Sequence, residues 1–332
     1  MIDPSVPAPG APWLRTADPG PGTVCVVGAG FYGSTLAQRI AEGDYVSRVV
    51  LTDVIEGRPQ GLALDLMQSR PIVGFRTEVV GANSYAEAAG CSVAVITAGV
   101  PRKPGMSRMD LLATNARIVA DVTRRLLDVA PDAVLIVVTN PLDEMTALAA
   151  AVSGLPRSRV MGQAGVLDTA RFREFLAERA GVLPEEVKAI TLGSHGDTMV
   201  PVPSLAYVGG RPLRDVLDDT AIAEIVTRTR DAGAEIVGLL KTGSAYFAPA
   251  AAAEAMVRAV VTGETDFLPV SAWLEGQYGI DGVYLGVPAR LGPLGVEEII
   301  ELPLAEAELA ALRVAAEAVR GKQMEAVALA GR

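Results

Sequence analysis

The sequence predicts an α/β protein, with a doubly wound parallel sheet in its N-terminal half and a mixed α+β domain after it. Three observations predict this fold class. Apolar runs alternate with helical patterns from Thr23 onward, a glycine-rich turn joins the first run to the first helix, and the pattern changes after about residue 163. Apolar runs without polar alternation are expected where helices cover both faces of a sheet.

Five β-like runs define the parallel sheet. They are TVCVVGAG, RVVLTD, TEVVGA, CSVAVITAG and AVLIVVTN. Helices are expected between them at about 33–42, 57–68, 107–129 and 142–152. This alternation predicts a first domain over 23–165, preceded by a flexible Pro/Gly-rich tail over 1–22.

The second domain, over 166–332, is expected to be mixed. The helix-like run TARFREFLAERAG precedes VKAITLGSHGDTMVPVPSLAYVGG, which is typical of a strand, a functional turn and a second strand. Two long helical stretches follow at about 219–261. The chain then continues with strand-like segments around FLPVSAWLEG, VYLGVPARLG and VEEIIELPL, and with a terminal helix from about residue 305.

The composition excludes several classes of function. The net charge of −10 offers no basic surface for nucleic acid and would repel an anionic membrane. No stretch approaches the roughly 20 apolar residues that span a bilayer, and the first 22 residues hold no apolar core of signal-peptide length. Cys25 and Cys91 lie in apolar runs, where buried thiols are favoured over a disulfide, a metal ligand or a nucleophile. We therefore expect a soluble, cytoplasmic protein without a resident metal.

The glycine-rich turn predicts a dinucleotide site. Gly28, Gly30 and Gly33 form a G-x-G-x-x-G motif that follows an apolar strand and opens a helix. Such glycines permit a tight turn, close approach to a pyrophosphate and close helix packing. Asp53 ends the next strand at the spacing of a ribose-binding carboxylate, which favours NAD because it would repel the extra phosphate of NADP. The alternative is an ordinary β-to-α turn with a surface aspartate.

One histidine is the candidate proton carrier. His195 is the only histidine of the chain and lies in the glycine-flanked segment GSHGD at the end of a strand. Oxidation of a secondary alcohol needs a base for the hydroxyl proton, and imidazole suits that task near neutral pH. Asp168 is a candidate to orient it, and Arg171 shares its helix face three residues later. The alternatives are a structural histidine and a surface ion pair.

A loop with three cations follows the strand CSVAVITAG. The segment VPRKPGMSR, at 100–108, is placed to fold over the crevice as a lid that brings cations to an anionic substrate. A solvated charge run is the alternative. Asn140, at the end of AVLIVVTN, is similarly placed to hydrogen-bond a substrate hydroxyl or carbonyl.

Together, GAGFYG, LTD, TAGVPRKPGMSR, VTNPLD, GQAGVLDTAR, GSHGDTMVP and LLKTGSAYFAPAAA resemble the lactate/malate dehydrogenase superfamily, closest to its lactate-dehydrogenase-like malate dehydrogenases. The resemblance runs from about Thr23 to the terminal helix. It implies a Rossmann domain that binds NAD, and hydride transfer to and from C2 of a 2-hydroxy acid. His195 would then donate or accept the proton, Asp168 would orient it, and Arg171 would clamp the C1 carboxylate.

The resemblance also assigns the lid. Arg108 would polarise the C2 carbonyl, and Asn140 would contact the same oxygen. The residue six positions before Arg108 separates substrates in this superfamily, with arginine for a dicarboxylic acid and glutamine for lactate. Here it is Arg102, which predicts malate and oxaloacetate. Ser244, in KTGSAYF, would line the far end of the substrate pocket.

Further expectations complete this hypothesis. Asn115 and Thr139 are assigned to the cofactor-binding set. The resemblance implies a homodimer or homotetramer that acts on a small dicarboxylic acid. The alternatives are a lactate or broader 2-hydroxy-acid dehydrogenase and a dinucleotide-binding protein without catalysis.

Overall fold

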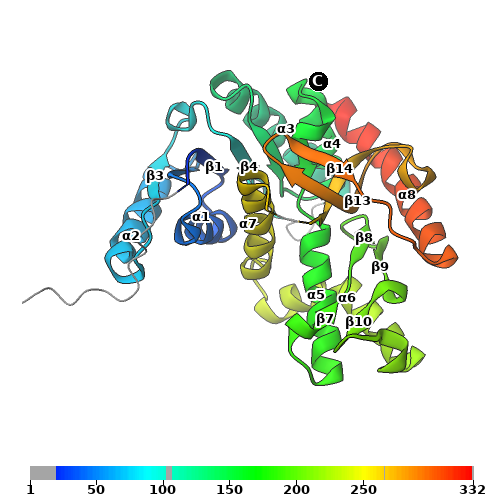
Figure 1. Ribbon diagram of the computed structural model, residues 1–332. Coiled ribbons are helices and arrows are strands. Elements are labelled where there is room, and N and C mark those ends of the chain that lie inside the picture. Colours follow the sequence, from blue (N-terminus) through cyan, green and yellow to red (C-terminus); the bar gives the residue numbers. More distant parts are fainter. Residues whose placement is uncertain (1–19, 102–106, 265, 331–332) are drawn as a thin grey trace, which may run out of the picture.

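The computed structural model describes residues 20–101, 107–264 and 266–330, and Figure 1 shows them as an α/β architecture. Within these residues an 11-stranded sheet runs through both halves of the chain, and a small 3-stranded sheet lies in the second half. The predicted fold class is confirmed.

The N-terminal strands form the parallel part of the large sheet. They are β1 (Thr23–Val27), β2 (Arg48–Thr52), β3 (Glu78–Ala82), β4 (Val93–Ile96), β5 (Val134–Val137) and β6 (Val160–Gly162). They lie in the order β3-β2-β1-β4-β5-β6, and neighbouring strands in this order are parallel. The order reverses between β1 and β4, and ligands of open α/β sheets bind at that point, beyond the carboxyl ends of the strands.

The helices of this half lie close to the predicted ranges. They are α1 (Phe31–Gly43), α2 (Arg58–Val73), α3 (Arg108–Val129) and α4 (Leu142–Ser153). Ser107 caps α3 in a reciprocal capping box with Asp110. α2 continues beyond the predicted end at residue 68 because Pro71 is tolerated inside it and Gly74, with φ +89°, ends it.

The second half is mixed, as predicted. Its helices are α5 (Gly165–Ala180), α6 (Asp219–Leu240), α7 (Phe247–Thr262) and α8 (Glu306–Ala330). Its strands are β7 (Val187–Lys188), β8 (Thr191–Gly193), β9 (Met199–Pro201), β10 (Tyr207–Val208), β11 (Arg211–Pro212), β12 (Leu268–Glu275), β13 (Asp281–Gly292) and β14 (Gly295–Ile299). The prediction of two strands around the GSHGD turn was too simple, because β7 and β10 pair in the small sheet while β8 and β9 join the large one.

The two halves share the large sheet. Ser271 of β12 pairs antiparallel with Gly162 of β6, so the parallel part continues into β12, β13, β8 and β9. A β-carbon at Gly162 would lie 2.5 Å from the Thr146 hydroxyl oxygen and 2.9 Å from the β-carbon of Ser271. Only glycine therefore allows this close approach of α4, β6 and β12.

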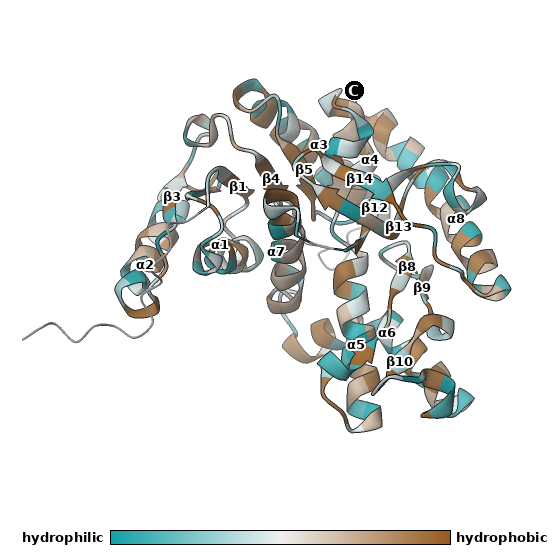
Figure 2. Ribbon diagram, viewed as in Figure 1, coloured by the Kyte–Doolittle hydropathy of each residue, from teal (hydrophilic) through white to brown (hydrophobic). Residues whose placement is uncertain are grey.

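Further packing ties the halves together. α7 lies beside α1 (Figure 1), and the Tyr32 hydroxyl donates a 2.7 Å hydrogen bond to the Pro249 carbonyl. The core is largely aliphatic, and β4 and β5 are brown in Figure 2. Cys25 and Cys91 are buried free thiols, as predicted. Within the described ranges, no helix has the length and apolar character needed to cross a membrane.

Candidate active site

The carboxyl ends of the parallel strands gather several of the predicted site residues. Gly28 follows β1, Asp53 follows β2, and Thr139 and Asn140 follow β5. Parallel strands end at one edge of a sheet, so these residues lie around the point where the strand order reverses.

The glycine turn fits a pyrophosphate. Gly28 has φ +106°, and a β-carbon there would lie 2.7 Å from the Thr97 hydroxyl oxygen. A β-carbon on Gly33 would overlap the Gly28 carbonyl, whereas one on Gly30 would meet nothing within 4 Å. Among the described residues no side chain caps α1, whose N-cap is Gly30 and whose first turn holds no acidic residue. The positive end of the helix dipole is therefore open to an anion.

Asp53 is fixed beside this turn. Its Oδ2 accepts a 2.7 Å hydrogen bond from the Ala29 amide, and its Oδ1 accepts one of 2.9 Å from the Ile55 amide. A carboxylate has about four lone-pair sites, so two remain for hydroxyl donors. The residues present therefore fit the phosphates and ribose of a dinucleotide.

Asn115 and Thr139 hold the strand ends together. The Asn115 side-chain amide donates to the Asn140 carbonyl at 2.6 Å, and its Oδ1 accepts from the Val100 amide at 2.9 Å. The Thr139 hydroxyl donates to the Ala98 carbonyl at 2.7 Å. Both side chains thus shape the loops after β4 and β5, and Asn140 in the second of these loops is exposed.

His195, Asp168 and Arg171 form a contiguous polar group. Nδ1 of His195 lies 2.9 Å from Oδ2 of Asp168, and Nη1 of Arg171 lies 3.3 Å from Oδ1 of the same aspartate. The Asp168 side chain is only 2% exposed. One buried carboxylate on α5 therefore binds both the imidazole and the guanidinium.

This environment favours the protonated imidazole. Burial lowers the pKa of His195, but the negative charge of Asp168 and its hydrogen bond outweigh that effect and raise the pKa above its ordinary value. Since Asp168 binds Nδ1, Nε2 is the nitrogen left for a substrate. The group can therefore exchange a proton beside a fixed cation.

Close backbone packing positions the histidine turn. Gly193, with φ +82°, ends β8, and Gly286 of β13 pairs with it. A β-carbon on Gly286 would overlap the Gly193 carbonyl, so β13 can approach β8 this closely only because residue 286 is glycine. The turn that follows carries His195 between β8 and β9.

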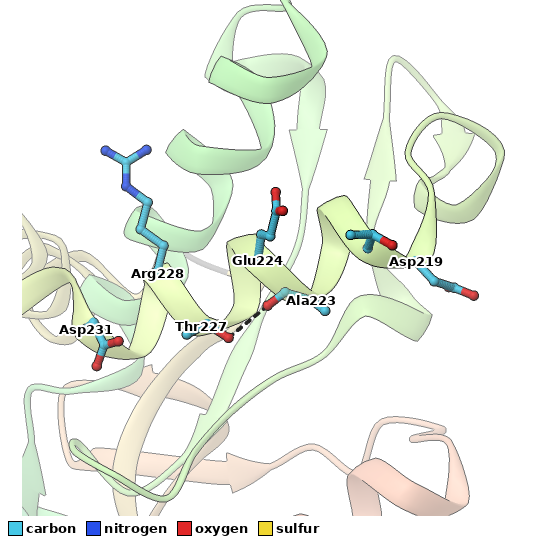
Figure 3. A pocket seen from close by; sticks show the side chains of 7 residues that line it. Asp219, Ala223, Glu224, Thr227, Arg228 and Asp231 are labelled. Carbon is cyan, nitrogen blue, oxygen red and sulfur yellow. Dashed lines mark hydrogen bonds between the residues drawn. The ribbon is translucent and has the colours of Figure 1, made fainter.

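The described surface also has hollows away from these residues. One, of about 840 Å³, follows α6, where Figure 3 shows Asp219, Glu224 and Arg228 spaced along the helix. Arg228 is already paired with Glu178 and Glu235. This hollow includes none of the predicted site residues, and its charges of both signs select no ligand.

The comparisons with known proteins identify the family. A family model described as lactate/malate dehydrogenase, NAD binding domain, matches residues 23–162, and one for its alpha/beta C-terminal domain matches residues 165–329. The chain belongs to the lactate/malate dehydrogenase family. Its members are NAD-dependent oxidoreductases, and this dehydrogenase uses NAD.

Individual members are similar over most of their length. A malate dehydrogenase of Trichormus variabilis is 52% identical over 90% of this chain and 91% of its own. The solved malate dehydrogenase of Salinibacter ruber is 46% identical with a TM-score of 0.87, covering 92% of this chain and 97% of its own. A lactate dehydrogenase of Cryptosporidium parvum, solved with lactic acid and the cofactor, is 41% identical with a TM-score of 0.88, covering 92% and 98%.

Two of the predicted arginines have no side chain among the described residues. Arg102 lies outside the described residues, and of Arg108 the structure describes only the backbone, as the first residue of α3. Ser244 is exposed on the loop between α6 and α7.

Sequence reasoning missed one acidic residue of the dehydrogenase. Asp143, in the first turn of α4, accepts hydrogen bonds from the His195 amide at 3.0 Å and from the Ser271 hydroxyl at 2.7 Å. Its position in VTNPLDE is typical of a carboxylate that stabilises a helix N-terminus, so the sequence alone gave no signal of this contact.

Proposed function

We propose that the protein is an NAD-dependent malate dehydrogenase that interconverts (S)-malate and oxaloacetate. The observation that carries the chemistry is the buried Asp168 carboxylate, which binds both His195 and Arg171. The malate dehydrogenases that are 52% and 46% identical support the choice of substrate. Because both compounds belong to the tricarboxylic acid cycle, we propose that the enzyme serves it.

A bound NAD would supply the acceptor for the hydride that leaves C2 of the alcohol. His195 takes the hydroxyl proton through Nε2, while Asp168 holds Nδ1 and stabilises the positive charge that develops on the ring. Arg171 binds the C1 carboxylate as a charged fork. In the reverse direction the protonated imidazole returns the proton to the carbonyl oxygen.

The remaining roles follow the family pattern. Arg108 polarises the C2 oxygen, which Asn140 also contacts, and Arg102 pairs with the second carboxylate. Ser244 leaves room at the far end of the pocket. In the cofactor site, Gly28, Gly30 and Gly33 admit the pyrophosphate and Asp53 binds the ribose, while Asn115 and Thr139 order the adjoining loops.

We also propose a soluble, cytoplasmic homodimer or homotetramer, with a cofactor domain over 23–165 and a substrate domain over 166–332. Two free, buried cysteines support a reducing compartment. Exposed apolar side chains support subunit contacts, for example Leu64 and Ile72 on α2, which are 61% and 71% exposed. Light scattering after size-exclusion chromatography tests the assembly.

A substrate panel tests the proposed function. Oxidation of NADH should be fast with oxaloacetate and slow with pyruvate. The similarity to a lactate dehydrogenase makes lactate the second candidate, and a preference for pyruvate would select it. A protein that binds NADH without oxidising it with any 2-oxo acid would instead be a non-catalytic relative.

Cofactor choice is predicted to depend on Asp53. Asp53→Ser combined with Val54→Arg, at a position 95% exposed, removes the carboxylate and adds a cation for the extra phosphate. We expect KM for NADH to rise about 10- to 100-fold, as for a lost hydrogen bond to a charged group, while NADPH becomes usable. Val54→Arg alone is the control and should keep the preference for NADH. Equal use of both cofactors by the unmodified protein would contradict the assignment.

Asp168→Asn is predicted to lower activity and shift its pH dependence. The amide still accepts a hydrogen bond from Nδ1, but its neutral charge lets the raised pKa of His195 fall. Oxaloacetate reduction needs the protonated ring, so its rate should start to fall at a lower pH in the variant than in the unmodified protein. Malate oxidation needs the neutral ring, so the pH at which its rate rises should also be lower in the variant. Profiles of kcat/KM against pH in both directions measure this shift. We also expect about 100-fold lower activity at neutral pH. Unchanged profiles would argue against the pairing of Asp168 with His195.

A further inference from the structure

Asp143 connects three segments at the base of the candidate active site. Its side chain extends from the first turn of α4, and the residue is 3% exposed. One carboxylate oxygen accepts from Ser271 of β12, and the other accepts from the amide of His195. The proposed chemistry gives this buried carboxylate no task, because it contacts the main chain of the histidine and not the imidazole.

We propose that Asp143 is a positioning residue that fixes the main chain of His195, so that the imidazole meets Asp168 and the substrate together. The inference rests on the proposed role of His195 in proton transfer.

The geometry supports this role because His195 is held at two points, its imidazole and its main-chain amide. Asp168 of α5 binds Nδ1 at 2.9 Å, and Asp143 of α4 binds the amide of the same residue at 3.0 Å. Glycines precede and follow the turn residues, and Gly193 has φ +82°, so the local backbone is permissive. The Ser194 and Thr198 hydroxyls, 2.6 Å apart, brace the turn internally, and the two aspartates anchor His195 to α4 and α5.

The hydrogen bonds indicate an ionised Asp143. Both of its oxygens accept, one from a hydroxyl and one from an amide. The pKa of this carboxyl is raised to about 6, chiefly by burial. The hydrogen bonds from Ser271 and from the His195 amide lower it, the charge of Glu144 raises it, and the charge of His195 lowers it. Asp168 and Arg171 face the imidazole from α5. Protonation would remove an acceptor and loosen the turn.

The single histidine makes the position of the ring measurable. In protein labelled with nitrogen-15 in histidine and purified without a histidine tag, His195 gives the only imidazole signals, which report its pKa and tautomer. Asp168 should hold the neutral ring in the Nδ1–H form. This readout does not depend on the identity of the substrate.

Two variants of Asp143 and one control separate its effect on the position of His195 from the effect of its charge. In Asp143→Asn the amide oxygen can still accept from His195, and the amide nitrogen can donate to the Ser271 hydroxyl, so position is kept and charge is lost. Asp143→Ala removes both. Thr146→Val is the matched control, because Thr146 is also buried, one turn later on α4, and its hydroxyl donates to the Leu142 carbonyl of its own helix.

We expect Asp143→Asn to retain the Nδ1–H tautomer with a lowered imidazole pKa. Asp143→Ala should lower the imidazole pKa as well, and should also lose the Nδ1–H tautomer. Asp143→Ala should also reduce kcat/KM for oxaloacetate about 100-fold, the scale of a misplaced catalytic group, with NADH binding and the control unchanged. An Nδ1–H tautomer kept in Asp143→Ala, or lost equally in Thr146→Val, would overturn the proposal. If Asp143→Ala does not fold, Asp143→Asn decides, since a lost tautomer there would contradict positioning by the amide oxygen. If the unmodified enzyme did not reduce oxaloacetate, but the tautomer was kept in Asp143→Asn and lost in Asp143→Ala, only the proposed function would fail.

Discussion

Replacement of His195 by asparagine is expected to reduce turnover of oxaloacetate and of malate by about 1,000-fold or more, the upper range of general acid–base catalysis. Asparagine cannot exchange a proton near neutral pH, and the chain has no second histidine to replace it. This loss corresponds to about 4 kcal/mol of transition-state stabilisation. Stopped-flow single turnovers with NADH measure it directly.

Binding of NADH should remain nearly unchanged in the same variant. His195 lies after β8, whereas the glycine turn and Asp53 follow β1 and β2, so the substitution leaves the dinucleotide contacts intact. Fluorescence titration with NADH checks this expectation. A variant that lost both turnover and NADH binding would identify His195 as a structural residue.

Arg102→Gln is expected to reverse part of the substrate preference. Oxaloacetate differs from pyruvate by one carboxylate, which must leave water inside the site and needs a charged partner. Loss of that partner should depress oxaloacetate reduction by about 2–5 kcal/mol and raise pyruvate reduction from a very low level. Comparison of kcat/KM for the two acids measures the change, while KM for NADH should stay constant.

Lys103→Gln supplies the matched control for Arg102→Gln. It removes one positive charge from the adjacent position of the same segment, and both positions lie outside the described residues. A general electrostatic effect would weaken oxaloacetate reduction equally in both variants. An unchanged ratio of oxaloacetate to pyruvate in Arg102→Gln would leave residue 102 without a discriminating role.

The N-terminal half could be predicted because its strands are buried on both faces. Runs such as VAVI in β4 and VLIV in β5 are wholly buried, which matches their continuous apolar sequence. β6 was missed because three residues, VMG, are too few to carry a pattern. β7 to β11 are as short or shorter, so their division between two sheets depends on tertiary pairing and not on local sequence.

The candidate site was predictable where chemistry and spacing coincide. Asp168 and Arg171 lie three residues apart on one helix, and the structure brings them to His195. The contact of Asp143 with the His195 amide joins residues 52 positions apart, through a backbone group that every residue type offers. No side-chain pattern can announce such a partner.

The pairing of Gly162 with Ser271 limits how freely the two matched regions can be exchanged between relatives. A chimaera joined near residue 163 would need a residue without a side chain at 162, to admit Thr146 and the incoming strand. It would also need a hydroxyl at 271 to meet Asp143. Recombination within this family should therefore succeed or fail by the compatibility of these few residues, and not by overall sequence identity. We therefore expect the two regions to act as co-adapted parts and not as interchangeable modules.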